Sequence, residues 1–287
     1  MNNRLSIVDA IRSLDRNTST FQQREVGLAP ARPVISVKTG SFIKDIVLGN
    51  CSPRVEPKVV PPPTLETYWR ASSIGSLCPV EEVYCAVKGL TRREQNTMDA
   101  DFRMKNGTFL HEWLIPFIDH LQGEWVCLSC GVVRTKWSPT CPACKSYNAA
   151  YRTPKLQNDI EYISGTPDGI GKVGEEREVV EIKTTRTSIK KFVDGELFAK
   201  YVVQCNVYMW LSGVSRARMF VFNPARLADN EEFILLRDDA LVAAQLATVR
   251  EIRKGIESKT VPYDLRNPVC TKLSCIARGD CQIAGTF

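Results

Sequence analysis

Two carboxylates and a lysine in the segment GTPDGIGKVGEEREVVEIKTT have the residue types that hold a metal ion and activate water. Asp168 follows a turn, and the next expected strand, Glu178–Lys183, carries Glu-Ile-Lys thirteen residues after it. Alternate side chains of a strand point the same way, so Glu181 and Lys183 share one side, and a hairpin would bring Asp168 beside them. The carboxylates and the Ile182 carbonyl suit Mg²⁺ or Mn²⁺. Lys183 would orient or deprotonate a metal-bound water, while the ion stabilises charge on a phosphodiester.

Pro167-Asp168 and Glu181-Ile182-Lys183 resemble the motif of the PD-(D/E)XK nuclease superfamily. That resemblance implies an α/β fold in which a central mixed sheet is flanked by helices. Glu-x-Lys alone is common on exposed strands, so the alternative interpretation is a salt-bridged hairpin.

Two further elements resemble the RecB-like branch of that superfamily. A histidine lies upstream on an expected helix, and Gln204-x-x-x-Tyr208 lies downstream on another. The resemblance implies that His111 adds a ligand to the catalytic metal, whereas His120 is a bystander. Gln204 and Tyr208 are four residues apart on one helical face and would point to the same DNA or active-site surface. The order of all four motifs is more specific than any one of them.

One set of cysteines has the spacing of a structural zinc site. Two Cys-x-x-Cys knuckles stand ten residues apart, within an insert at 125–151, and their members are Cys127, Cys130, Cys141 and Cys144. Four thiolates at this spacing form a closed tetrahedral site, and a short polar insert of this kind is expected to fold only with the metal bound. Such a zinc ribbon binds DNA, binds protein or stabilises a loop, and the sequence does not choose among these.

A second, split set consists of Cys78 before the motifs and Cys270, Cys275 and Cys281 after them. It resembles the iron–sulfur staple of the RecB-like subgroup that includes CRISPR-adaptation nucleases and AddB-type nucleases, which implies a [4Fe–4S] cluster. The usual C-terminal pattern of that subgroup is C-x2-C-x5-C, but here Cys270 and Cys275 are separated by four residues. Cys85 is therefore an alternative fourth ligand, and a site that has been lost or that holds zinc is another interpretation. The remaining cysteines, Cys51 and Cys205, are expected to be free thiols.

Bulk properties describe an ordinary globular chain of 287 residues with 44% hydrophobic residues and a net charge of +6. Residues 1–60 contribute nine Lys or Arg against five Asp or Glu, most of the positive excess. No apolar run is long enough to span a bilayer, and the N-terminus does not resemble a secretory signal, so we expect no membrane association and a cytoplasmic protein, or one in the host cytoplasm if the chain is viral.

The distribution of elements predicts a basic, proline-rich, partly disordered segment at 1–64, with a short helix near Leu5–Leu14, followed by a nuclease domain at 65–287 that carries the zinc-ribbon insert. Helical spacing of Phe109, Trp113, Phe117 and Leu121 predicts a helix over 108–121, interrupted by Pro116. Residues 198–211 and 239–256 also favour helices, residues 159–163, 178–183, 217–222 and 232–236 favour strands, and the chain from Tyr263 onward is expected to be loop.

The leading hypothesis is a metal-dependent deoxyribonuclease, with exonuclease action on single-stranded ends implied by the resemblance alone. The pathways it implies are DNA repair, recombination, replication or CRISPR-type DNA processing, with protein partners from those systems and a phage or viral source as one option. Two alternatives stay open: a duplex-specific endonuclease of the resolvase or restriction type, and a non-catalytic DNA-binding or adaptor module built on the zinc ribbon.

Overall fold

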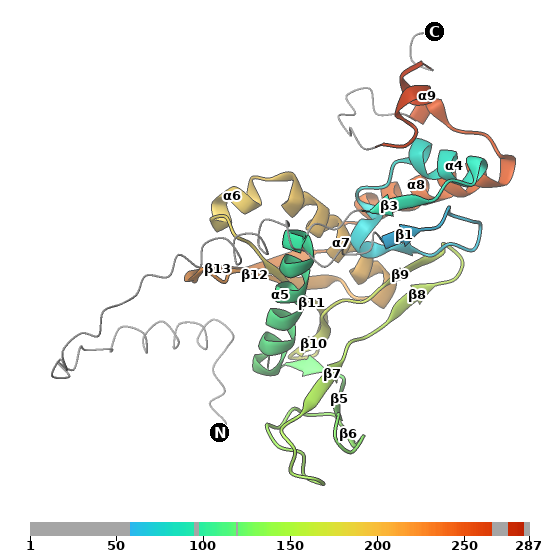
Figure 1. Cartoon of the computed structure of the whole chain (residues 1–287). Coiled ribbons are helices and arrows are strands. Elements are labelled where there is room, and N and C mark those ends of the chain that lie inside the picture. Colours follow the sequence, from blue (N-terminus) through green and yellow to red (C-terminus); the bar gives the residue numbers. More distant parts are fainter. Residues whose placement is uncertain (1–57, 95–97, 119, 266–274, 284–287) are drawn as a thin grey trace, which may run out of the picture.

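A five-stranded mixed sheet is the centre of the molecule. The computed structural model describes residues 58–94, 98–118, 120–265 and 275–283 (Figure 1). The sheet has the order β13-β12-β11-β10-β4, formed by Arg226–Leu236, Arg216–Asn223, Glu176–Thr184, Gly169–Val173 and Leu121–Gln122. Only β11 and β12 are parallel; the other neighbours are antiparallel. The predicted mixed α/β fold, a central sheet flanked by helices, is therefore confirmed.

The central strand β11 is buried on both faces because helices cover both. Val179 faces one core cluster, which includes Val207 of α7 (Glu196–Ser212) and Val249 of α8 (Asp239–Ser258). Val180 and Ile182 face a second cluster beneath α5 (Met98–Leu114) and the 3₁₀ turn η1 (Ile115–Phe117). A parallel pair needs a crossover connection, and α6 (Ile189–Val193) with α7 supplies it between β11 and β12.

Smaller elements complete the body beside α8. Helix α4 (Pro79–Lys88) packs on α8, where Gly255 allows the approach: a Cβ there would lie 2.8 Å from Val83 Cγ2. The other short elements are β1 (Lys58–Val60), β2 (Trp69–Arg70), α3 (Ala71–Ile74), β3 (Arg92–Glu94), β8 (Leu156–Asn158), β9 (Ile163–Gly165), η2 (Tyr263–Leu265) and α9 (Arg278–Ile283). Strand β1 pairs with β3, and β2, β9 and β8 form a small sheet.

The cysteine-bearing insert projects from the edge of the central sheet, below it in Figure 1. It contains β5 (Glu124–Cys127), β6 (Val133–Arg134) and β7 (Ala149–Arg152), in the order β6-β5-β7. Its two ends pair with each other, since Glu124 lies opposite Arg152, so the insert leaves the body and returns to it at one place.

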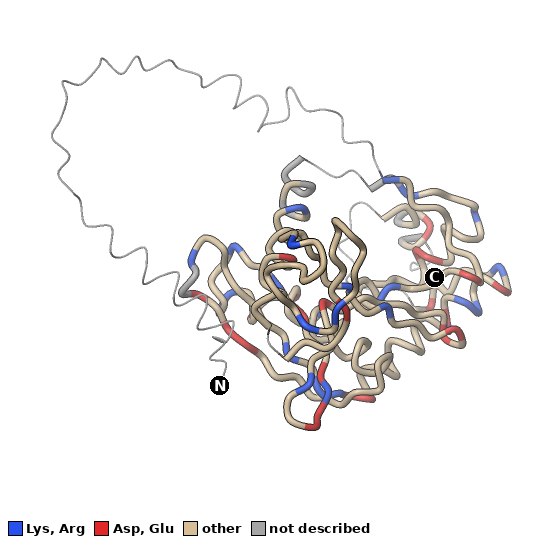
Figure 2. The backbone as a smooth tube through the Cα atoms, turned by 90° about the horizontal axis from the view of Figure 1, so that it is seen from below, with Lys and Arg blue, Asp and Glu red and all other residues tan. Residues whose placement is uncertain are grey.

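A buried charged network ties the insert side of the sheet together. Glu178 is only 1% exposed, and its carboxylate accepts hydrogen bonds from Arg216 Nε at 2.9 Å and Arg218 Nε at 2.5 Å. His120 Nε2 lies 3.1 Å from the same carboxylate. Burial disfavours the charged form, but Arg218, Arg216 and His120 outweigh it and lower the pKa of Glu178. Elsewhere, positive and negative side chains are interspersed along the chain (Figure 2).

Three expectations about secondary structure were wrong. Residues 159–162 form the turn between β8 and β9 rather than a strand, because the Asn158 side chain accepts hydrogen bonds from the backbone amides of Ile160 and Glu161. The helix expected over 108–121 instead covers Met98–Leu114 and ends before Pro116. The C-terminal region contains η2 and α9 in addition to loop.

The described residues do not include 1–57, which contain Cys51 and the helix expected near Leu5–Leu14. They also do not include Cys270. The proposed division into 1–64 and 65–287 stays a prediction. Of the helices that the structure describes, none is long and apolar enough to cross a bilayer.

Candidate active site

The central sheet opens into a notch beside β11, and Asp168 occupies it. Pairing between β10 and β11 ends where Gly169 lies opposite Val180, so the next residues of β11 lack a strand on that side. The Asp168 carboxylate replaces the missing strand, since the Ile182 backbone amide donates to Asp168 Oδ2 at 2.7 Å. The amide and carbonyl of one strand residue point to the same edge, so the Ile182 carbonyl faces the notch as well.

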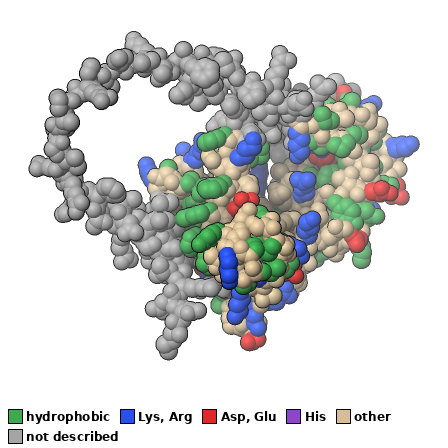
Figure 3. Space-filling model, turned by 60° about the horizontal axis from the view of Figure 1, so that its bottom comes forward, with side chains coloured by type: hydrophobic (Ala, Val, Ile, Leu, Met, Phe, Trp, Pro, Cys, Tyr) green, Lys and Arg blue, Asp and Glu red, His purple; other side chains and the backbone are tan. Residues whose placement is uncertain are grey.

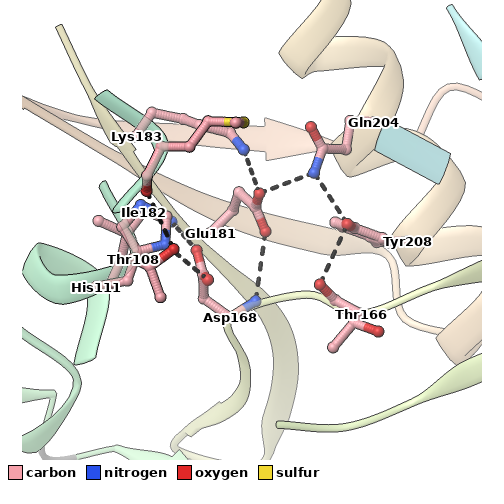
Figure 4. Close-up of polar contacts among 10 residues, drawn as sticks. Thr108, His111, Thr166, Asp168, Glu181, Ile182, Lys183, Gln204 and Tyr208 are labelled. Atoms are coloured by element: carbon pink, nitrogen blue, oxygen red, sulfur yellow. Dashed lines mark hydrogen bonds and ion pairs between the residues drawn. The ribbon is translucent and has the colours of Figure 1, made fainter. Parts of the chain in front are cut away.

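Glu181 and Lys183 form a buried ion pair at the edge of this notch (Figure 4). Lys183 Nζ donates to Glu181 Oε1 at 2.5 Å, and the two side chains are 14% and 4% exposed. Burial and then the charge of Asp168 raise the pKa of Glu181 to about 7, although Lys183 opposes the shift. Burial alone would lower the pKa of Lys183, but Glu181 and Asp168 outweigh it and raise that pKa. The notch therefore holds two carboxyl groups and only one close ammonium.

Helix α5 brings His111 to the same place from the other side of the notch. His111 Nδ1 lies 3.0 Å from Asp168 Oδ1, and both side chains are partly exposed. His120, by contrast, contacts Glu178 and not Asp168 or Glu181 in the described contacts. The two histidines thus lie at different positions, and of the two it is His111 that contacts a residue of the notch.

Helix α7 holds Glu181 from the opposite face of the sheet. Gln204 Nε2 donates to Glu181 Oε1 and to the Tyr208 hydroxyl, both at 2.9 Å, and that hydroxyl donates to the Thr166 carbonyl at 3.2 Å. All three side chains are nearly buried, with Gln204 at 4% and Tyr208 at 3% exposed. A Cβ on Gly165 would lie 2.4 Å from Tyr208 Cε1, so the close approach of Tyr208 requires glycine there.

Tyr201 is a contact of the site that the sequence motifs did not identify. It precedes Gln204 by one helical turn, and Lys183 Nζ lies 4.4 Å from the centroid of its ring. The ring itself stacks on Phe192 of α6, with centroids 5.8 Å apart and planes at 29°. The signal was available in the sequence, because Tyr201, Gln204 and Tyr208 are spaced i, i+3 and i+7 and share a helical face.

The donor set at the notch fits a divalent cation. The carboxylates of Asp168 and Glu181 and the Ile182 carbonyl are hard oxygen donors, and His111 adds a nitrogen, a mixture that suits Mg²⁺ or Mn²⁺. The raised pKa of Glu181 marks a carboxyl group that is short of compensating positive charge, which a cation would supply. The structure brings together every residue that the motifs nominated, and the roles assigned to them stay predictions.

The four cysteines of the insert converge as their spacing predicted. The sulfurs of Cys127 and Cys144 are 3.6 Å apart, those of Cys130 and Cys141 are 3.7 Å apart, and all four lie within 4.8 Å of one another. A tetrahedral zinc with Zn–S bonds of about 2.3 Å separates its sulfurs by about 3.8 Å, so the cluster fits that ion. A hydrogen bond from the Cys144 backbone amide contributes most to lowering the pKa of Cys141 to about 6. The Val132 backbone would lower the pKa of Cys130, but Cys144 and burial outweigh it and raise that pKa to about 12.

The second cysteine set is distributed over α4 and α9. Cys78 precedes α4, Cys85 lies within it and is fully buried, and Cys275 and Cys281 lie before and on α9. Helices α4 and α9 are neighbours: the side chain of Tyr84 on α4 is hydrogen-bonded to that of Asp280 on α9, and this bond raises the pKa of Tyr84. Among the cysteines that the structure describes, only the four of the insert have sulfurs close enough together to hold one metal ion. Cys205 is buried on α7 and is not one of them.

Comparisons with known proteins return structural likeness only. No family model and no curated protein matches the chain. An alkaline exonuclease from Laribacter hongkongensis aligns at 18% identity over 68% of this chain and 90% of that one, with a TM-score of 0.42. A phage-related exonuclease from Haemophilus somnus 129PT aligns at 14% identity over 67% of this chain and 94% of that one, with a TM-score of 0.40. The Laribacter enzyme in complex with dAMP aligns at 17% identity over 76% of this chain and 95% of that one, with a TM-score of 0.40. Scores this low assign neither a family nor an activity.

Proposed function

We propose that the chain is a Mg²⁺- or Mn²⁺-dependent deoxyribonuclease of the PD-(D/E)XK type, RecB-like branch, that hydrolyses phosphodiester bonds from single-stranded ends. The observation that supports this most directly is the convergence of Asp168, Glu181, Lys183 and His111 on one notch, from one strand, the turn before the next strand of the sheet and a helix. A purely structural hairpin would not need the buried Glu181 carboxylate, which accepts hydrogen bonds from the Asp168 backbone amide, Lys183 and Gln204.

Each side chain has a distinct part in this proposal. Asp168, Glu181, His111 and the Ile182 carbonyl would hold the cation, which supplies Lewis-acid stabilisation of the charge that develops on the phosphodiester. Lys183 Nζ, fixed by its ion pair with Glu181, would orient the attacking water by donating a hydrogen bond. Gln204 and Tyr208 keep the Glu181 carboxylate in place by the buried hydrogen bonds described above.

The test compares two lysines on neighbouring strands of one sheet. Purified protein is given end-labelled single- and double-stranded DNA with Mg²⁺, Mn²⁺ or no divalent ion. Lys183→Met should lower the rate by about 100-fold or more, as expected when the attacking water is no longer held in position. Lys172→Met on β10, whose side chain pairs only with the exposed Glu175 in the described contacts, should leave it unchanged.

Closed circular single-stranded DNA separates the modes of cleavage. An exonuclease leaves the circle intact while it shortens the linear strand, whereas an endonuclease of the resolvase or restriction type opens circles or cuts duplex. DNA binding without cleavage under every divalent ion would reject the catalytic proposal in favour of a binding or adaptor module.

The metal proposal extends to both cysteine sets. The insert cluster would hold zinc, supported by its sulfur separations. Cys78, Cys275 and Cys281, with Cys270 or Cys85 as the fourth ligand, would hold a [4Fe–4S] cluster that ties α4 to α9, and the proximity of these two helices supports this. Anaerobically purified protein should then be brown with broad absorbance near 400 nm, and metal analysis of the same sample should give iron and zinc separately; a colourless, iron-free sample would reject the cluster.

A further inference from the structure

A groove at the base of the insert is the feature that neither the notch nor the cysteine cluster explains. It has a volume of about 730 Å³ and lies where η1 and β4 meet the insert strands. Figure 3 brings this part of the molecule to the front and shows apolar and basic side chains together on it. The residues that line the groove include Pro116, Leu121, Gln122, Trp125, Lys136 and Trp137.

The groove has a fixed aromatic wall. Trp137 packs edge to face on Trp125, with ring centroids 6.3 Å apart, and Trp125 in turn contacts Tyr151 at 5.2 Å. Trp125 is buried at 4% exposure, whereas Trp137 is only partly buried and keeps exposed surface in the groove. A tryptophan held in this way is a stacking surface for an unpaired base, whose flat face is inaccessible in a duplex.

The charge of the groove suits a phosphate backbone. Lys136 is exposed and, within the part of the chain that the structure describes, forms no ion pair. The one acidic lining residue, Glu124, is already paired with Arg152. The insert sequence at 125–151 contains three basic residues and no Asp or Glu. An anionic strand would therefore meet Lys136 without an opposing free carboxylate.

The groove lies near the candidate active site, because one residue of its lining packs against the residue that follows Asp168. Leu121 of its wall lies against Gly169, since a Cβ there would be 2.3 Å from Leu121 Cδ2, and Gly169 directly follows Asp168. On the other wall, Pro116 stands five residues after His111, an advance of about 7.5 Å along a helix axis. A strand lying in the groove would thus pass close to the notch.

We infer that this groove binds single-stranded DNA next to the position of cleavage, with a base stacked on Trp137 and a phosphate held by Lys136. The inference rests on the proposed nuclease function and assigns the zinc ribbon a part in holding the substrate. Gln122, on the edge strand β4, adds an amide that can hydrogen-bond to the same strand.

The experiment measures binding rather than cleavage. The full-length Lys183→Met protein is titrated into a short fluorescein-labelled oligothymidylate, and anisotropy gives Kd at several salt concentrations. Trp137→Ala should weaken binding by about 5- to 100-fold, the usual effect of removing one stacking ring. Lys136→Ala should weaken it severalfold and reduce the slope of log K against log salt by about one, as one phosphate contact is lost.

Matched controls lie on the same insert. Tyr147 is 80% exposed and Lys145 is exposed, and neither lines the groove. Tyr147→Ala and Lys145→Ala should therefore leave both Kd and the salt slope unchanged. Zinc content and Tm of every variant show whether the insert has kept its fold, and Lys136→Ala, a surface change, keeps the test decisive if Trp137→Ala does not fold.

Several results would overturn the inference. Wild-type affinity and salt slope in Lys136→Ala, or equal losses in the Lys145 and Tyr147 controls, would remove the groove as a binding site. An equal effect of the groove substitutions on a fully paired duplex would contradict stacking of an unpaired base. Failure of the nuclease proposal is distinguishable, because it would show as absent cleavage by the wild type while the groove variants still lose binding.

Discussion

Replacing Tyr201 with leucine should slow cleavage without weakening the binding of DNA or metal. Its ring faces the Lys183 ammonium at 4.4 Å and contacts none of the nominated metal ligands in the described contacts. A cation–π contact contributes about 0.5–2 kcal/mol, and the low 14% exposure of Lys183 favours the upper part of that range, about 1–2 kcal/mol. At 1.36 kcal/mol for each factor of ten, the rate should fall about 5- to 30-fold.

The assay compares kcat, KM and Mn²⁺ affinity across three variants. Tyr201→Phe keeps the ring and should keep kcat within about twofold of the wild type, because phenylalanine also binds cations through its face. Tyr201→Leu should lower kcat alone. Phe198→Leu is the packing control, since Phe198 contacts Phe192 and Phe233, at 5.9 and 5.1 Å, but has no described contact with Lys183.

Two outcomes would refute this reasoning. Equal losses of kcat in Phe198→Leu and Tyr201→Leu would mean that general packing of α6 and α7, rather than the ring over Lys183, sets the rate. A loss in Tyr201→Phe as large as in Tyr201→Leu would assign the effect to the hydroxyl group. In a Lys183→Met background, Tyr201→Leu should have no further effect on any residual rate.

Three other substitutions test the site, the sheet and the insert. Gly165→Ala should cost about 1–3 kcal/mol in a denaturant titration and lower the cleavage rate by up to about 100-fold, because the new methyl displaces Tyr208. Glu178→Gln should cost about 1–3 kcal/mol at neutral pH, because the partly buried Arg216 and Arg218 lose their shared carboxylate and keep only Glu176 and Glu232 as acidic partners. Because folding lowers the pKa of Glu178, its carboxylate stabilises the fold above the ordinary pKa of 4.5, and this stabilisation is lost as pH falls through the lower folded-state pKa. The Tm of Glu178→Gln should therefore fall less steeply with acid than the Tm of the wild type. Cys141→Ser should remove zinc from the protein and lower the Tm of the insert, and unchanged zinc content would contradict the assigned ligand.

The motifs were predictable from sequence because each depends on local geometry. Alternation along a strand places Glu181 and Lys183 on one side, and a four-residue spacing places Gln204 and Tyr208 on one helical face. The cysteine cluster was predictable for the same reason, since each knuckle is a tight turn of fixed length. None of these required knowledge of which distant segment would be the neighbour.

The parts that were not predictable depend on tertiary partners. Strand β4 has two residues, and they are a strand only because β10 lies beside them. The helical face that Tyr201 shares with Gln204 follows from their spacing, but its contact with Lys183 does not, because that lysine is on a distant strand. The spacing of Phe109 and Trp113 predicted an apolar helical face, yet both are exposed while Leu114 and Ile115 are buried, because the residues that face the sheet depend on where the helix lies.

The position of the insert follows from how the sheet ends. Asp168 enters the notch because β10 stops pairing with β11 at Gly169, and β4 pairs with the far edge of that same short strand. The insert leaves the chain directly after β4, and the pairing of Glu124 with Arg152 closes its base. A groove on that base is therefore held rigidly beside the notch by backbone pairing. If the groove binds single-stranded DNA as proposed, the insert would form a fixed wall beside the position of cleavage.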